Sequence, residues 1–194
     1  MIAIMFNKPS ELLSELADKE LSLEDGERLF RAGAPVRNVY LVREGRVRLL
    51  RHQSDGAALV LQCAGAGDLL AEASIFAACY HCDAFADGPS TVLRVPRGRV
   101  EKLHVENPGW LAVLAKHLAL EVQRARARAE ILFLKRVESR LDAWLELNGG
   151  RLPERGGWVG LSFEIGVSPE ALYRELAHRR HRDPPHKVSS SRRR

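Results

Sequence analysis

The chain has 194 residues, of which 45% are hydrophobic and 28% charged, values typical of a globular protein with one large or two small domains. Its apolar runs fall well short of the roughly 18–20 residues that cross a bilayer, and its start lacks the pattern of an export signal. With three cysteines and no disulfide framework, the sequence predicts a cytoplasmic protein with reduced thiols and no membrane partner.

The net charge of +5 is concentrated at the C-terminal end. Residues 178–194 hold seven Lys or Arg against one Asp, so the rest of the chain is close to neutral. We expect residues 184–194 to form a basic disordered tail. Such a tail either attracts a polyanion or is simply solvated.

The first half of the chain carries β-type patterns after one short helix. Residues 10–20 have leucines at helical spacing, with Ser10 as the expected N-cap. Short strand-like runs with glycine turns follow, and the Glu44-Gly45 pair joins two of them as a hairpin would. These patterns predict an antiparallel, jelly-roll-like β-roll, which with the N-terminal helix forms a domain in residues 1–106. Its strand-like runs are residues 28–32, 38–43, 46–51, 58–64 and 90–96.

From Asn107 the apolar period becomes helical. Asn107 can cap a helix, Pro108 fits its first turn, and neither Gly nor Pro interrupts the pattern after Gly109. We predict a long dimerisation helix in residues 107–136, about 40 Å long. A second copy of the chain could cover its apolar stripe; the alternative is that the helix packs only on its own domain. The stripe comprises Leu111, Leu114, Leu118, Val122, Ala125, Ala129 and Leu132.

Residues 160–180 have the pattern of a helix–turn–helix. Gly166 suits a tight turn, and a Ser-Pro-Glu start to the next helix follows it. With the helix that begins at Val137 and stops at Gly149-Gly150, this predicts a small helical DNA-binding domain in residues 137–183. A capped helical hairpin without a DNA role is the alternative. The expected base contacts are Pro169, Glu170, Tyr173 and Arg174, and the expected phosphate contacts are Ser168, Arg179 and Arg180.

The stretch "CYHC" places Cys79 and Cys82 around His81. Structural zinc needs four ligands, usually from two such pairs, and the sequence has one pair. A redox switch or plain packing of small side chains remains open. With one such pair we expect no bound metal or cofactor. Since no nucleophile is accompanied by its own base and orienting group, we do not expect an enzyme.

The order of helix, roll, long helix and helix–turn–helix resembles the Crp–Fnr transcription regulators over about residues 15–180. The resemblance rests on "VYLVREGRVRLLR", "GAGDLLAEASIF", the long helix and "EIGVSPEALYREL". It implies an α+β protein that forms a homodimer, binds double-stranded DNA and senses an effector in its roll.

The resemblance also marks the effector pocket. In family members that bind cyclic AMP, a Gly-Glu pair is followed ten residues later by Arg-Ser or Arg-Thr. This chain has Ala71-Glu72 and then Cys82-Asp83, so the phosphate loses its arginine, at a cost of about 2–5 kcal/mol. We therefore expect an unknown small-molecule or redox effector other than cyclic AMP.

A second departure concerns the segment after the helix–turn–helix. Family members have a β-hairpin wing there, and this chain shows no strand pattern. The alternative function is therefore a ligand-sensing or scaffolding dimer that has lost specific DNA binding.

Overall fold

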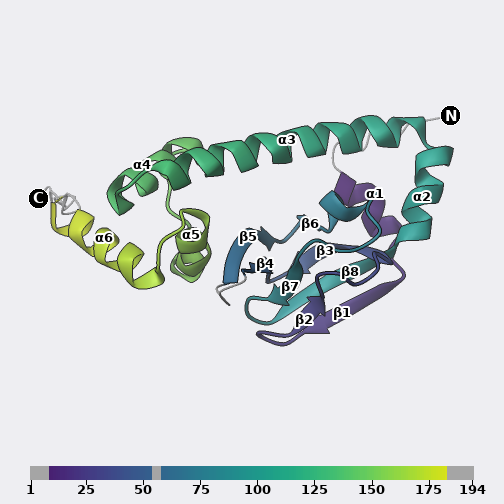
Figure 1. Cartoon of the computed structure of the whole chain (residues 1–194), viewed down its shortest axis with the longest axis horizontal. Coiled ribbons are helices and arrows are strands. Elements are labelled where there is room, and N and C mark those ends of the chain that lie inside the picture. The colour runs from purple at the N-terminus through teal and green to yellow at the C-terminus, as the bar shows by residue number, and fades with distance from the viewer. Residues whose placement is uncertain (1–8, 54–57, 183–194) are drawn as a thin grey trace, which may run out of the picture. The chain divides into compact units, whose positions relative to one another are not determined.

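The computed structural model describes residues 9–53 and 58–182 (Figure 1). The chain divides into two units, Met1–Arg126 and Ala127–Arg194, and the division falls within the long helix. The domain boundaries expected at residues 106 and 136 remain predictions. The expected basic tail at 184–194 and the segment in which we expect no wing lie outside the described residues.

The first helix ends earlier than expected. Helix α1 (Pro9–Glu15) buries Leu12 and Leu13 in the core of the roll. Ser10 lies inside the helix, so its predicted role as N-cap is wrong. The helix does not continue to residue 20, because strand β1 (Lys19–Leu23) pairs there with the last strand of the roll.

The roll consists of antiparallel strands in two sheets, as far as the structure describes it. The first sheet has the order β1-β8-β3-β6 and the second the order β2-β7-β4-β5, with one apolar core for the unit. The expected α+β class and β-roll are confirmed. The strands not yet bounded are β2 (Arg28–Phe30), β3 (Asn38–Glu44), β4 (Arg46–His52), β5 (Ala58–Gly65), β6 (Leu69–Leu70), β7 (Asp83–Ala86) and β8 (Ser90–Pro96).

The hairpin predicted at Glu44-Gly45 is wrong, because β3 and β4 belong to different sheets. Gly45 lies where the chain crosses between the sheets, with φ +79°. The Ser90 hydroxyl holds this crossing: it donates to the carbonyl of Arg46 at 2.8 Å and accepts from its N–H at 3.0 Å. A Cβ on Gly45 would lie 2.5 Å from the Pro89 carbonyl oxygen, so the crossing admits only glycine.

Two helices follow the roll (Figure 1). Helix α2 (Arg97–Glu106) was not predicted, and helix α3 (Pro108–Phe133) is the expected long helix. Asn107 caps α3 as predicted, since its side-chain oxygen accepts the N–H of Trp110 at 3.2 Å. Trp110 and Leu114 are buried in the roll core.

The second unit is helical. Its elements after α3 are α4 (Val137–Leu147), the 3₁₀ turn η2 (Arg155–Gly157), α5 (Trp158–Glu164) and α6 (Pro169–Arg182). Helix α4 ends before Gly149 and Gly150 as predicted, and both glycines have positive φ. No helix in the described ranges is long and apolar enough to cross a membrane. The core residues are Ile131, Leu141, Leu161, Ile165, Leu172 and Leu176.

We predict that Gly45→Ala lowers the free energy of unfolding by more than about 2 kcal/mol, because it combines a left-handed backbone with a clash against backbone atoms. Gly26→Ala is the matched control: Gly26 has φ +74° but nothing within 4 Å of the added methyl, so we expect a loss of about 1 kcal/mol. Urea unfolding of both variants measures the difference, and equal losses would contradict the crowded crossing.

Candidate functional site

The turn between α5 and α6 has the geometry of a helix–turn–helix. Gly166 takes φ +64°, and a Cβ there would meet the side chains of Leu132 and Arg140. The Ser168 hydroxyl accepts the N–H of Ala171 at 3.2 Å, so Ser168 caps α6 as predicted. Hydrogen bonds from its own backbone N–H and from Ser168 lower the pKa of Glu170. A negative charge is thereby fixed at the positive end of α6.

The outward face of α6 carries the residues that the sequence pattern selected. Glu170, Tyr173 and Arg174 are exposed, whereas Leu172 and Leu176 are buried against the core of the unit. The ring of Tyr173 lies 5.7 Å from that of Trp158, which supports its position on the surface. Ser168 and Arg180 are also exposed, and Pro169 is half-buried.

Arg179 does not point outward, which corrects the placement that the sequence suggested. Its guanidinium pairs with Asp142 of α4 at 2.6 Å and with Glu175 one turn earlier at 2.7 Å. It also donates to the carbonyl of Glu138 at 3.0 Å. Arg179 therefore joins α6 to α4, because its guanidinium bonds a carboxylate and a carbonyl of α4 as well as Glu175 of its own helix.

Sequence reasoning missed Arg140, which holds the turn in place. Its guanidinium donates to the carbonyls of Ile165 at 3.1 Å and Gly166 at 2.7 Å. It donates as well to Leu132 at 3.1 Å and Leu134 at 2.7 Å, at the end of α3. No signal in the sequence could have identified it, because its partners are backbone carbonyls, which every residue carries.

In the roll, Ala71 is the first of the expected effector-pocket residues, and its backbone is strained. Among the described residues other than glycine, Ala71 alone has positive φ, at +68°. It precedes the 3₁₀ turn η1 (Glu72–Ser74) and places Glu72 inside the protein, 8% exposed. Within the described chain, Oε2 of Glu72 has no hydrogen-bond partner. Burial, assisted by the charges of Glu121 and Asp68, raises the pKa of Glu72 to about 7.

Cys82 and Asp83, at the expected phosphate position, differ in their surroundings. Cys82 is 2% exposed, and burial raises the pKa of its thiol to about 11. Asp83 accepts the N–H of Ala32 at 3.2 Å and lies 3.4 Å from the His52 ring. Because a neutral thiol and a carboxylate both lack a guanidinium's donors, this position does not fit a cyclic phosphate.

The remaining polar groups of the "CYHC" stretch are held by neighbouring elements. The His81 ring lies 3.0 Å from the Ser74 hydroxyl, and burial lowers the pKa of His81. Arg51 of β4 donates to the His81 carbonyl at 3.2 Å. Cys79 is exposed while Cys82 belongs to the core, and in the described ranges no three His, Cys, Asp or Glu gather as metal ligands do. Whether the two thiols respond to oxidants remains a prediction.

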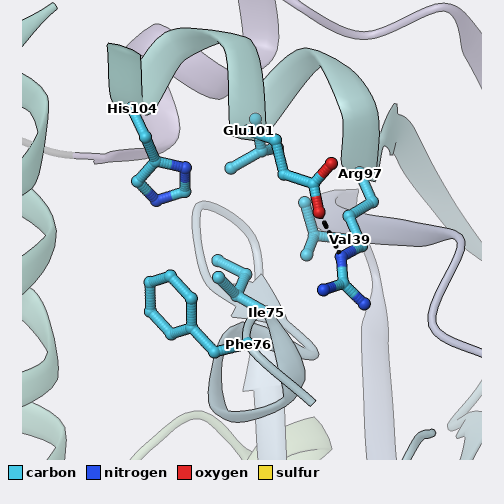
Figure 2. Close-up of a pocket in the computed structure, with 7 residues that line it drawn as sticks. Val39, Ile75, Phe76, Arg97, Glu101 and His104 are labelled. Carbon is cyan, nitrogen blue, oxygen red and sulfur yellow. Dashed lines mark hydrogen bonds and ion pairs between the residues drawn. The ribbon is translucent and has the colours of Figure 1, made fainter. Parts of the chain in front are cut away.

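A separate hollow of about 40 Å³ lies between α2 and the segment after η1 (Figure 2). Ile75 and Val39 form part of its apolar lining, and Figure 2 shows His104 facing Phe76 across it. Arg97 and Glu101 pair at 2.8 Å along its edge. Its volume is enough for a few water molecules but not for a nucleotide.

Comparison with known proteins finds a family match within the first unit. Residues 20–107 match the family described as the cyclic nucleotide-binding domain. This match covers the roll and less than half of the chain. The whole arrangement of the chain, with the long helix and the helix–turn–helix, is the fold of the Crp–Fnr regulators, as the resemblance implied.

Individual proteins that resemble this chain are distant in sequence. Electron transport regulator A of Shewanella oneidensis is 22% identical over 74% of this chain, which spans only 58% of that relative. FixK2 of Bradyrhizobium japonicum is 22% identical, with a TM-score of 0.72 over 84% of this chain and 85% of its own. A CRP/FNR-family transcriptional regulator from Thermus thermophilus is 26% identical, with a TM-score of 0.59 over 83% of this chain and 87% of its own.

The pKa of Glu72 predicts a pH-dependent stability. The folded state binds the proton more tightly than the unfolded chain does, so stability falls as pH rises from the ordinary value of 4.5 through about 7. Between pH 5 and pH 8 we expect the wild type to lose about 2–3 kcal/mol more than Glu72→Gln, which cannot ionise. Urea unfolding at both pH values measures this difference, and parallel pH profiles would contradict it.

Proposed function

We propose that this protein is a homodimeric, sequence-specific DNA-binding transcription regulator whose roll senses an effector other than cyclic AMP. The observation that carries this proposal is the capped helix α6, whose N-terminal half exposes Glu170, Tyr173 and Arg174 above a buried leucine pair. A helix held by its hydrophobic side and free on its polar side can enter the major groove.

The exposed groups have donors and acceptors suited to base edges. Arg174 can donate two hydrogen bonds to guanine, and the ionised Glu170 can accept from cytosine. Ser168 and Arg180 lie where phosphates would flank the helix, and they would fix its register without reading sequence. Arg179 has a supporting role in this proposal, because its donors are engaged by α4 and by Glu175.

The dimer would form along α3. Apolar side chains along this helix are exposed, among them Leu111 at 46%, Val122 at 48% and Leu132 at 40%. From Leu118 to Leu132 the apolar positions recur alternately at four and three residues, which is the spacing of a helix that pairs with another. Pairing with a second copy would remove this surface from water and place two recognition helices on one DNA site.

The effector assignment rests on the roll. The place of the phosphate-binding arginine is taken by a buried, neutral thiol next to a carboxylate, so an anionic cyclic phosphate would lose its principal donor and gain a repulsive charge. Glu72 remains, and the unpartnered Oε2 of its buried carboxylate favours an effector that donates a hydrogen bond over one that is an anion.

We predict that Val122→Glu converts the dimer into a monomer, because it places a charge in each half of the apolar seam. Gln123→Glu is the matched control, since it adds the same charge at the neighbouring exposed position and should leave the dimer intact. Analytical ultracentrifugation of both variants reads the mass. A wild type that is monomeric at micromolar concentrations would rule out pairing through α3.

Arg174→Ala should weaken binding to the preferred DNA site by about 1–3 kcal/mol and relax the preference at one base pair. Arg180→Ala should weaken binding to all sequences alike, because a phosphate contact carries no sequence information. Fluorescence anisotropy with the preferred site and with random DNA separates the two. An equal loss on both DNAs for Arg174→Ala would contradict base reading by this residue.

The alternative, a ligand-sensing or scaffolding dimer, predicts a different outcome of the same titration. Wild-type binding would then be weak, equal on both DNAs, and lost between about 50 and 200 mM salt.

A further inference from the structure

The buried carboxylate of Glu72 lies within range of the negative charges of acidic groups from several elements of the first unit. Asp68, in the turn before β6, and Glu121, on α3, both act on it with like charge. The Cys82 thiol also interacts with Glu72, and Asp83 of β7 adds a further negative charge beside that thiol.

The cations in this region are engaged elsewhere. Arg51 lies beside Cys82 and donates to the His81 carbonyl. Arg124 pairs with Glu121 at 2.6 Å. The neutral hydroxyl of Ser74, at the other end of η1, lies 3.0 Å from the His81 ring. Within the described chain, therefore, no ion pair or hydrogen bond from a side chain reaches Oε2 of Glu72.

We propose that Glu72 is a proton-binding site through which the roll senses pH, with α3 as the element that responds. The DNA consequence of this inference rests on the proposed function, whereas the proton site and the response of α3 do not. A proton needs no cavity, and it removes the cost of a charge that burial and two neighbouring carboxylates oppose.

The direction of the response follows from the charges. Below neutral pH the carboxyl group is uncharged and does not repel Glu121, and this part of α3 packs on the roll core through Leu118. Above neutral pH Glu72 ionises and repels Glu121, which is held on α3 by its pair with Arg124. The repulsion opposes packing of this part of α3 on the roll, so higher pH should loosen the helix around residue 121.

The experiment uses the full chain with carboxyl ¹³C labels. NMR should show Glu72 titrating with a midpoint near 7, in keeping with its raised pKa of about 7. Hydrogen exchange, corrected for the intrinsic effect of pH, should show protection of α3 amides around residue 121 falling at least about fivefold between pH 6 and pH 8. Glu72→Gln should abolish this change, and Glu121→Gln should lower the midpoint of Glu72 and reduce the change.

Glu130→Gln is the matched control, because Glu130 is an exposed glutamate of the same helix and should leave both readouts unchanged. A Glu72 midpoint below 5, or protection of α3 that does not depend on pH, would overturn the inference. So would a wild-type response that survives in Glu72→Gln.

Specific DNA binding is measured on the same samples. If α3 responds as described while the chain shows no sequence preference on DNA, the proton site stands and the proposed regulator function fails. If specific binding is present but Glu72 titrates below 5, the regulator function stands and the proton site fails.

Discussion

One helix supplies side chains to both hydrophobic cores found in residues 9–53 and 58–182. Trp110 and Leu114, near the start of α3, belong to the core of the roll, and Ile131, near its end, belongs to the helical core. Because the helix has no glycine or proline after its first turn, it is a continuous element between these two sets of contacts. Any change in how the roll holds the first part of α3 therefore acts on an element that the second unit also uses.

The second unit holds its end of α3 by hydrogen bonds in addition to apolar packing. Arg140 joins the last carbonyls of α3 to the turn of the helix–turn–helix, and Arg179 joins the recognition helix α6 to α4. Both arginines are partly buried, where charge-assisted hydrogen bonds are stronger than at the surface. The residues that position the reading surface are thus different from those that face outward on it.

The parts of the fold that sequence patterns predicted are those determined locally. The cap at Ser168, the turn at Gly166 and the cap at Asn107 each depend on residues within a few positions, and all were predicted. The crossing at Gly45 was misread as a hairpin, because a Glu-Gly pair between two strands looks the same whichever sheet the strands join. Only the distant contact with Ser90 distinguishes the two cases.

The candidate site follows the same division. The exposed residues of α6 could be selected from helical spacing, whereas the inward turn of Arg179 depends on Asp142, 37 positions away. The burial of Glu72 depends on Ala71 adopting a left-handed backbone, which alanine rarely does and which no pattern indicates. The importance of Glu72 was therefore visible only through the family resemblance, and its environment only in the structure.

The most direct test of the account is selection of DNA from a random library by the purified chain at physiological salt. The account predicts enrichment of a palindrome whose half-sites lie about one helical turn, or roughly 34 Å, apart. This spacing arises because the two copies of α6 would enter successive major grooves on one side of the DNA. Enrichment of no sequence would contradict it, as would binding that disappears between about 50 and 200 mM salt, because such binding would come from nonspecific charge alone.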